Sequence, residues 1–269
     1  MLQPQPSGLY FGAYGTGSRP VISGADIIGN RFFSWWYQTA SNVWSVSVNA
    51  APTQLWFNGV LGTQVSTAAQ VLAPQQWSYV HGRVSVFSKS YPSLQYNAPG
   101  IEATQRPQAL LLTNITGVTV EHIAFMNGGS TTACLCSGMK GQATFNDDVF
   151  SGTLNEGVNV LSGSAVFTGS ELIENGIGMS VRGGQGFTMS NSIVSGSANQ
   201  AVLVASSTGP SSIFAFTISG NSTNSAMTEV MTNSSSYGLT VSSSVLLPNP
   251  YQPKVFNFSG MTDGGKNFY

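Results

Sequence analysis

Short runs that mix apolar and hydroxyl-bearing residues recur along the second half of the chain, and each run closes on a glycine. The gaps between successive closing glycines are 24, 24, 20 and 24 residues, and the glycines are Gly128, Gly152, Gly176, Gly196 and Gly220. Self-similarity at a period of about 20–50 residues is typical of stacked repeats. Because each repeat reads as strand and turn with no helical segment, the pattern predicts a parallel β-helix, which is an all-β solenoid.

Alignment of the repeats on their closing glycines predicts which side chains stack between neighbouring coils. This register places five residues in one interior column: Phe125, Val149, Ile173, Ile193 and Thr217. Most of them are β-branched or aromatic, as a packed β interior requires. Asn127 and Asn175 stand beside their glycines and are expected at tight corners. A shift of one residue in this register would exchange the inner and outer faces of the strands.

The N-terminal part of the chain has a different pattern. It contains all five tryptophans and several strand-like stretches, among them NVWSVSV at 42–48 and RVSVFS at 83–88. One stretch, TAAQVLA at 67–73, is expected to be helical. We therefore predict that residues 1–98 form a first coil and a Trp-rich, hairpin-like β excursion. Residues 99–269 are predicted to form the remaining coils and a C-terminal strand tail, within one continuous solenoid domain.

Several segments resemble those of a known superfamily, both in amino-acid sequence and in the order in which they follow one another along the chain. They include YGTGSRPVISGADI at 14–27, QLWFNGVLGTQVST at 54–67, QQWSYV at 75–80, PGIEAT at 99–104 and GVTVEHIAF at 117–125. Across most of residues 12–220 the chain is similar to the secreted right-handed parallel β-helix proteins of the pectate-lyase-like superfamily. The resemblance implies a right-handed solenoid, with the Trp-rich part inserted after the first coil and PGIEAT returning the chain to the helix.

The same resemblance implies features that are not evident in this chain. Relatives usually begin with an amphipathic helix that caps the solenoid, and no such helix is visible in the sequence. Enzymes on this fold carry acidic calcium ligands and an Arg or Lys base, and no convincing equivalent set stands out. A calcium ion is therefore expected only if the protein is an enzyme, and otherwise no cofactor is expected.

Charged residues are scarce, at 7% of the chain, against roughly 25% in ordinary globular proteins. The 41% of hydrophobic residues argues against disorder, and the lack of a long uninterrupted apolar window argues against a membrane span. A net charge of −1 without a basic patch argues against nucleic acid as a partner. A surface of Ser, Thr, Asn and Gly suggests an extracellular or cell-surface protein. The N-terminus is not a signal peptide, so we expect that a leader was removed or that the natural start differs.

Paired acidic residues supply the main candidate for chemistry. In the glycine-anchored register, Asp147 of the pair Asp147–Asp148 stacks with Glu171 and with Asn191. Neighbouring coils lie about 4.8 Å apart, so Asp147 and Glu171 could share a calcium ion or act as paired carboxylates. Like charges stacked without a cation destabilise a sheet, so either a cation or a splayed geometry is implied.

Basic partners for these carboxylates are harder to find. Arg182 and Lys140 are the candidates for a base, but neither falls in the same column. The alternative interpretation of Arg182 is an exposed residue at a glycine turn, without a catalytic role. The pair Glu121–His122 could act as an acid and a base, but adjacent residues on a strand point to opposite faces.

Two other groups are candidates for a role. Cys134 and Cys136 form a C-x-C pair that is either a strained local disulfide or two thiols packed in the core. Trp35, Trp36 and Tyr37 form an aromatic run that packs in a core, contacts another subunit or binds sugar.

The sequence favours a structural role. A solenoid that lacks caps exposes unpaired backbone at its ends, and such repeats stack end to end. The C-terminal tail could donate a strand to the next molecule. We therefore expect a protein that self-associates head to tail as a fibre, matrix or surface-layer subunit, without catalysis. The alternatives are a polysaccharide lyase or glycoside hydrolase, and a carbohydrate-binding or adhesion module, both with polysaccharide as the partner.

Overall fold

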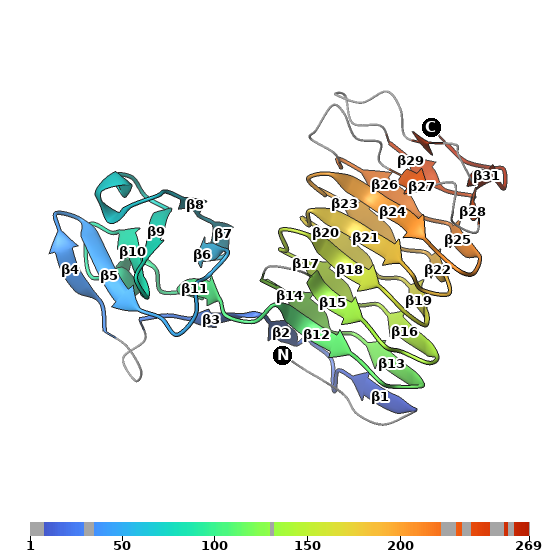
Figure 1. Cartoon of the computed structure of the whole chain (residues 1–269), viewed down its shortest axis with the longest axis horizontal. Helices are drawn as coiled ribbons and strands as arrows, with labels where there is room; N and C mark the ends of the chain where they lie inside the picture. Colours follow the sequence, from blue (N-terminus) through green and yellow to red (C-terminus); the bar gives the residue numbers. More distant parts are fainter. Residues whose placement is uncertain are drawn as a thin grey trace. The chain divides into compact units, whose positions relative to one another are not determined.

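The computed structural model divides the chain into two compact units. One consists of Met1–Ser23 and Gln108–Tyr269, and the other of Gly24–Pro107. The structure describes residues 8–29, 35–129, 132–221, 230–232, 238–247, 256–257 and 261–268. The first unit is a parallel β-solenoid and the second is a smaller, mainly antiparallel β unit (Figure 1).

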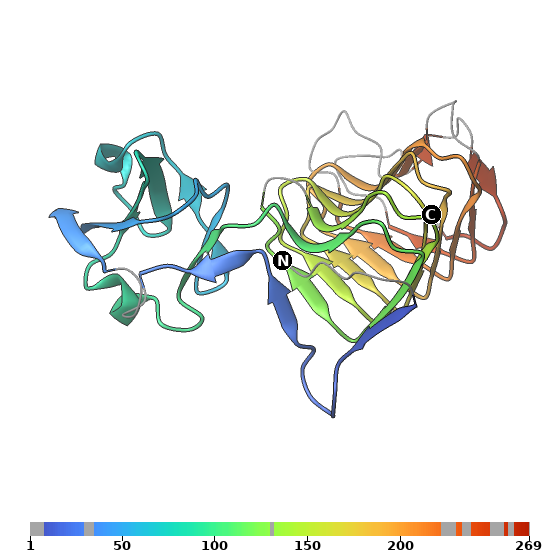
Figure 2. The ribbon, with the colours of Figure 1, turned by 60° about the horizontal axis from the view of Figure 1, so that its bottom comes forward.

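Three parallel sheets form the solenoid, and each coil contributes one strand to each sheet in turn (Figures 1 and 2). Sheet 1 contains β1 (Leu9–Gly12), β13 (Gly117–Glu121), β16 (Gln142–Asn146), β19 (Ser164–Thr168), β22 (Phe187–Ser190), β25 (Ser211–Phe214), β28 (Leu239–Ser242) and β31 (Met261–Asp263). Sheet 2 contains β2 (Val21–Ser23), β14 (Ala124–Met126), β17 (Val149–Ser151), β20 (Glu171–Ile173), β23 (Ile193–Ser195), β26 (Thr217–Ser219) and β29 (Val245–Leu246). Sheet 3 contains β12 (Gln108–Leu112), β15 (Thr132–Cys136), β18 (Glu156–Val160), β21 (Ile177–Arg182), β24 (Gln200–Ser206), β27 (Val230–Thr232) and β30 (Phe256–Asn257). The predicted all-β parallel solenoid is confirmed.

Two columns of left-handed residues turn the chain at its corners. The corner from sheet 1 to sheet 2 has positive φ at His122, Asp147, Gly169, Asn191, Ala215 and Ser243. The corner from sheet 2 to sheet 3 has positive φ at Asn127, Gly152, Glu174, Gly196 and Gly220. Glycine and asparagine adopt this conformation at low cost, which explains why they recur in the sequence. Gly128 and Gly176 lie just beyond this second column, so they are not equivalent to the other closing glycines.

The predicted interior column was therefore wrong. Phe125 pairs with Phe150 rather than Val149, and the inner column of sheet 2 continues through Leu172 and Val194. Val149, Ile193 and Thr217 lie together in the neighbouring, outward column, because anchoring on Gly128 shifts the register by one residue.

Aromatic and aliphatic side chains fill the solenoid interior. Phe125 stacks on Phe150 with ring centroids 5.4 Å apart, and Phe145 stacks on Phe167 at 4.9 Å. Phe145 also meets the edge of Phe150 at 5.2 Å, so the four rings form a continuous cluster across successive coils. Such contacts add to the free energy gained by burying apolar area.

The second unit has its own core and two sheets. One sheet has the order β4 (Tyr37–Ala40), β5 (Val43–Ser47), β10 (Arg83–Phe87), β9 (Gln76–Val80) and β8 (Thr63–Gln64). The other has the order β3 (Ala25–Ile27), β11 (Ile101–Thr104), β6 (Leu55–Phe57) and β7 (Val60–Leu61). A 3-10 helix η1 (Ala68–Gln70) lies within the segment predicted to be helical, and α1 (Pro92–Gln95) is a further single turn.

The chain enters this unit after β2 and leaves it before β12. The PGIEAT segment was expected to return the chain to the solenoid, but its strand β11 pairs antiparallel with β3 and β6 inside the second unit. The solenoid resumes at Gln108. In the C-terminal tail, β30 and β31 continue sheets 3 and 1, while residues 251–255 and 258–260 lie outside the described part of the chain.

Candidate functional site

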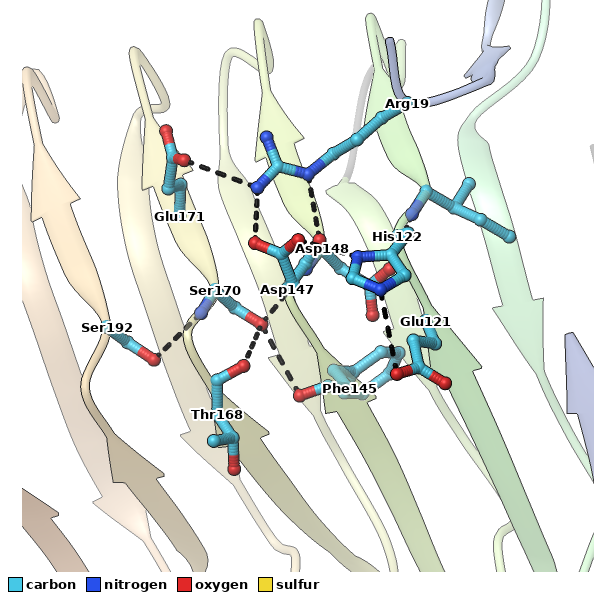
Figure 3. Close-up of polar contacts among 11 residues, drawn as sticks. Arg19, Glu121, His122, Phe145, Asp147, Asp148, Thr168, Ser170, Glu171 and Ser192 are labelled. Atoms are coloured by element: carbon cyan, nitrogen blue, oxygen red, sulfur yellow. Dashed lines mark hydrogen bonds and ion pairs between the residues drawn. The ribbon is translucent and has the colours of Figure 1, made fainter. Parts of the chain in front are cut away.

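Several of the chain's few charged residues gather at the corner between sheets 1 and 2 (Figure 3). Four of the ten acidic residues lie there, together with an arginine and one of the two histidines. They are Arg19, Glu121, His122, Asp147, Asp148 and Glu171. Five of the nineteen Asp, Glu, Lys and Arg residues of this sparsely charged chain therefore lie at one corner.

The corner geometry aims these side chains outward, with the exception of Asp148. Asp147 is the left-handed residue that follows β16, and His122 holds the same position one coil earlier, after β13. Glu171 is the first residue of β20, and Arg19 belongs to the segment that joins β1 to β2. The exposed fractions of the Asp147, Glu171 and Arg19 side chains are 44%, 37% and 31%, so the cluster is open to solvent.

Arg19 connects the two carboxylates that the sequence singled out. Its Nη2 contacts Asp147 Oδ1 in a very short ion pair, and its Nε donates to the Asp147 carbonyl oxygen at 2.8 Å. The same Nη2 lies 3.7 Å from Glu171 Oε1. Asp147 and Glu171 are therefore neighbours through a shared guanidinium. They do not stack directly, because Gly169 is the residue that follows Asp147 in the corner column.

His122 extends the cluster toward the first coil. Its Nδ1 lies 2.6 Å from Asp147 Oδ2, and its Nε2 lies 3.7 Å from Glu121 Oε1. The Tyr10 hydroxyl donates a very short hydrogen bond to Glu121. Glu121 and His122 were expected to point to opposite faces, but His122 has left the strand at the corner, so its ring contacts both carboxylates.

The ionisation of the cluster follows from these contacts. Partial burial acts to raise the pKa of Asp147, but hydrogen bonds from Arg19 and His122 outweigh it and hold the pKa below its ordinary value. The hydrogen bond to Glu121 raises the pKa of Tyr10. Asp147 is thus an ionised carboxylate at neutral pH, while Tyr10 keeps its proton.

Asp148 has a different environment from its neighbour. Its side chain is fully buried, and Oδ1 accepts the Ile123 backbone N–H at 2.8 Å. Its equivalents in the next two coils are Ser170 and Ser192, which also accept backbone N–H groups. Desolvation raises the pKa of Asp148 to about 7. Asp148 therefore belongs to the buried column of side chains at this corner that accept backbone N–H groups, and it does not face the open cluster.

The remaining residues predicted from the sequence lie elsewhere. Arg182 pairs with Glu156 at 3.1 Å and donates to the Ser180 hydroxyl at 2.9 Å, both on sheet 3. Lys140 is exposed in the segment between β15 and β16. Neither supplies the base that the carboxylate pair lacked.

The cysteines and the aromatic run have separate environments. Cys134 and Cys136 are fully buried free thiols in the solenoid core. Trp36 is buried in the core of the second unit, whereas Trp35 is 64% exposed. Arg83 lies over the Tyr37 ring, 4.7 Å from its centroid. The three aromatic residues therefore do not form a single exposed platform.

Sequence reasoning missed Arg19, Tyr10 and the double contact of His122. Arg19 stands in the YGTGSRPVISG segment that carried the resemblance, but its partner Asp147 is far along the chain. Across residues 8–29, 35–129 and 132–221 and the shorter described segments beyond, no group of three His, Cys, Asp or Glu is placed to hold a metal ion. No helix within the described chain is long and apolar enough to cross a membrane.

Comparison with known proteins supports the fold. No protein-family model matches the chain, and no curated protein does. The fold is similar to that of XylC, solved in complex with xylose, with a TM-score of 0.63 and 10% sequence identity. The match covers 93% of this chain and 59% of the XylC chain, so this chain spans less than two thirds of that protein. The comparisons thus place the chain among proteins of parallel β-helix fold.

Proposed function

We propose that this protein is a carbohydrate-active enzyme that hydrolyses glycosidic bonds at the exposed cluster of Arg19, His122, Asp147 and Glu171. The observation that carries the proposal is the pair of carboxylates, Asp147 and Glu171, that contact the same Arg19 nitrogen on an open corner. Glycosidases use two carboxyl groups that are about 5 to 10 Å apart, and two carboxylates that contact one nitrogen cannot be farther apart than the upper end of that range.

The two carboxyl groups have different surroundings, which supports different roles. Asp147 is held ionised by Arg19 and His122, so it acts as the nucleophile or the base that activates water. Glu171 has only the looser 3.7 Å contact with Arg19, so it is the carboxyl group left for the second role, beside the glycosidic oxygen. Water adds at the anomeric carbon, and the product is two shorter chains.

A sugar substrate is supported by two further points. XylC, which has a similar fold, was solved with xylose bound. The surface outside the cluster has few charges, which suits a neutral glycan better than a polyuronate. We include an extracellular location in the proposal, because polysaccharides of this class are met outside the cell.

A calcium-dependent lyase is supported less well. The Arg19 guanidinium contacts both Asp147 and Glu171, so it already supplies the positive charge that a calcium ion would bring to these two carboxylates. The residues as arranged do not fit a calcium ion between them.

The test is an activity screen on neutral polysaccharides and polyuronates with matched variants. We expect new reducing ends on a neutral substrate without ultraviolet-absorbing unsaturated products. Asp147→Asn and Glu171→Gln should each lower kcat by at least about a hundredfold. Glu174→Gln is the control, because Glu174 is an exposed carboxylate on the same coil outside the cluster.

Thermal melts of the variants establish that each is folded at the assay temperature, because Asp147→Asn is expected to lose some stability whether or not the cluster is catalytic. If the cluster only ties the first coil to the solenoid, the unmodified protein will hydrolyse none of the substrates. Unsaturated products would favour the lyase. Binding without cleavage would favour a carbohydrate-binding or adhesion module, for which the exposed Trp35 is the other candidate contact.

End-to-end self-association is a second candidate, supported by the open end of the solenoid. In the part of the chain that is described, β1, β2 and β12 are the terminal strands of their three sheets. Leu9, Phe11 and Ile22 at this end are only partly buried against the core. Unpaired strand edges favour pairing with another molecule. Polymers that grow with concentration in negative-stain images would support a fibre, matrix or surface-layer role, and a monomer at every concentration would refute it.

A further inference from the structure

The first coil has an enlarged corner between sheets 1 and 2. In the six later coils this corner consists of two residues, such as His122 and Ile123 between β13 and β14. In the first coil it consists of eight, residues 13–20 between β1 and β2, which we call the β1–β2 loop. The loop projects beyond the sheets (Figure 2, dark blue). The additional residues therefore stand at the corner that carries the charged cluster.

Hydrogen bonds fix both ends of the β1–β2 loop to residues of the cluster. At one end, Ala13 donates its backbone N–H to the Glu121 carbonyl oxygen at 3.1 Å. At the other end, Arg19 Nε donates to the Asp147 carbonyl oxygen at 2.8 Å. Only residues 14–18 lie between these two anchors, so the tip of the loop is confined to the neighbourhood of the cluster.

Tyr14, at this tip, gains little from its place in the fold. Its side chain is fully exposed, and a side chain at Gly15 or Gly17 would meet no other heavy atom within 4 Å. Gly15 has a φ of 88°, a conformation that favours glycine. Tyrosine combines an apolar ring face with a hydroxyl group and is enriched where a surface contacts another molecule. The ring is therefore available to a ligand at the cluster.

We propose that Tyr14 stacks on the sugar bound beside Asp147 and is a specificity-determining residue of the candidate site. The inference rests on the proposed hydrolase function and adds to it a substrate contact from the first coil. The loop supplies the ring, and its two anchors keep the ring close to the carboxylates.

The spacing of the coils is compatible with this contact. Gly12, Glu121 and Asn146 are paired positions at the ends of β1, β13 and β16. Two spacings of about 4.8 Å place the base of the loop about 10 Å from the residue that precedes Asp147. Because glycine permits large changes of backbone angle, the tip can bring the ring over a bound sugar while both anchors stay in place.

Stacking and catalysis have different kinetic signatures. A ring that contacts the sugar equally in the ground state and in the transition state contributes uniform binding, so its removal raises KM and leaves kcat unchanged. Loss of the Asp147 carboxylate lowers kcat instead. The role proposed for Tyr14 is therefore distinguishable from the roles proposed for the two carboxylates.

Four variants separate the ring from its surroundings. Tyr14→Ala removes the ring, and Tyr14→Phe keeps it without the hydroxyl group. Thr16→Ala is the matched control, because Thr16 is an exposed residue of the same tip. Trp35→Ala removes the competing exposed aromatic residue of the second unit. All four should melt at the temperature of the unmodified protein, since each replaced side chain is exposed.

The experiment measures kcat and KM on the substrate that the unmodified protein cleaves. In the Glu171→Gln background, calorimetry measures the affinity for xylo-, cello- and manno-oligosaccharides without turnover. We expect Tyr14→Ala to raise KM and Kd about threefold to tenfold, with kcat changed less than about twofold. Tyr14→Phe, Thr16→Ala and Trp35→Ala should match the unmodified protein.

Several results would overturn the inference while the proposed function stands. They are an unchanged KM for Tyr14→Ala, an equal loss for Thr16→Ala, a loss for Tyr14→Phe that assigns the contact to the hydroxyl group, and a loss confined to Trp35→Ala. If the unmodified protein neither cleaves nor binds any of the sugars, the inference and the proposed function are both refuted.

Discussion

Replacement of Asp148 by asparagine is expected to stabilise the protein at neutral and alkaline pH. Asp148 is fully buried, and its Oδ2 has no hydrogen-bond partner among the described residues. Burial raises its pKa to about 7, so the folded protein carries a poorly compensated carboxylate above that pH.

Three asparagines indicate what an amide would do at this position. Each accepts a backbone N–H of the preceding coil through Oδ1 and donates Nδ2 to the carbonyl three residues before that N–H. The pairs of partners are Thr153 and Phe150 for Asn175, Ser197 and Val194 for Asn221, and Ser244 and Val241 for Asn267. By the same rule, the amide of Asp148→Asn keeps the Ile123 contact and donates to the Val120 carbonyl.

The magnitude follows from the pKa shift. The folded pKa of about 7 is raised from an ordinary value of 3.8, so between these limits the folded state binds more protons than the unfolded state. Stability is therefore lost as pH rises through this window, by on the order of 4 kcal/mol in total. The Asp148→Asn variant does not lose this stability as pH rises. Its new hydrogen bond contributes about 1 kcal/mol to the free energy of unfolding at every pH.

Urea unfolding of both proteins between about pH 5 and pH 8.5 measures this difference. The neighbouring groups Asp147, His122 and Cys134 are present in both proteins, so their own titration largely cancels. The gain should grow with pH and level off above about pH 8. A difference that does not change with pH, or a loss of stability at pH 8, would refute the reasoning. Asp147→Asn is the control with the opposite sign, because the pKa of Asp147 is lowered by Arg19 and neutralisation should destabilise the protein at pH 7.

Three other outcomes can be checked by standard measurements. Phe150→Ala removes a fully buried ring that contacts three other phenylalanines, and chemical denaturation should show a loss of about 3–5 kcal/mol. Glu174→Gly should raise stability by up to about 1 kcal/mol, because Glu174 has a φ of 55° in a column otherwise rich in glycine; a loss would contradict this account of the corner. Cys134 and Cys136 should resist a thiol reagent until the protein unfolds, since burial raises the pKa of Cys134 well above its ordinary value, and rapid labelling of the folded protein would disprove it.

The solenoid fold was predictable from the sequence, whereas its register was not. The strand-and-turn repeats reflect the local backbone conformation of one coil. Every coil of a parallel solenoid adopts the same conformation, so the repeats indicate the fold. The left-handed corner, however, accepts Asn127 and Glu174 as well as glycine, so glycine spacing alone does not fix which residues are equivalent. An error of one residue was enough to move Val149 and Ile193 from the outer face to the core.

The candidate site was predictable only in part. Asp147 and Glu171 were singled out as acidic residues one coil apart, and both lie in the cluster. Their connection through Arg19 depends on a turn of the first coil that reaches a later corner, and no local pattern in the sequence encodes such a contact. His122 was discounted because strand alternation does not hold once the chain has left the strand.

The way the second unit joins the solenoid bears on how such a protein can change over evolution. Residues 24–107 replace a turn that elsewhere, between Ser151 and Glu156, needs only a few residues. Each coil pairs only with the coils directly before and after it. A whole additional unit can therefore be gained, exchanged or deleted at this corner while the strands of the remaining coils keep their pairing. The junctions after Ser23 and before Gln108 are therefore natural grafting points, at which a foreign module could be spliced without redesign of the scaffold.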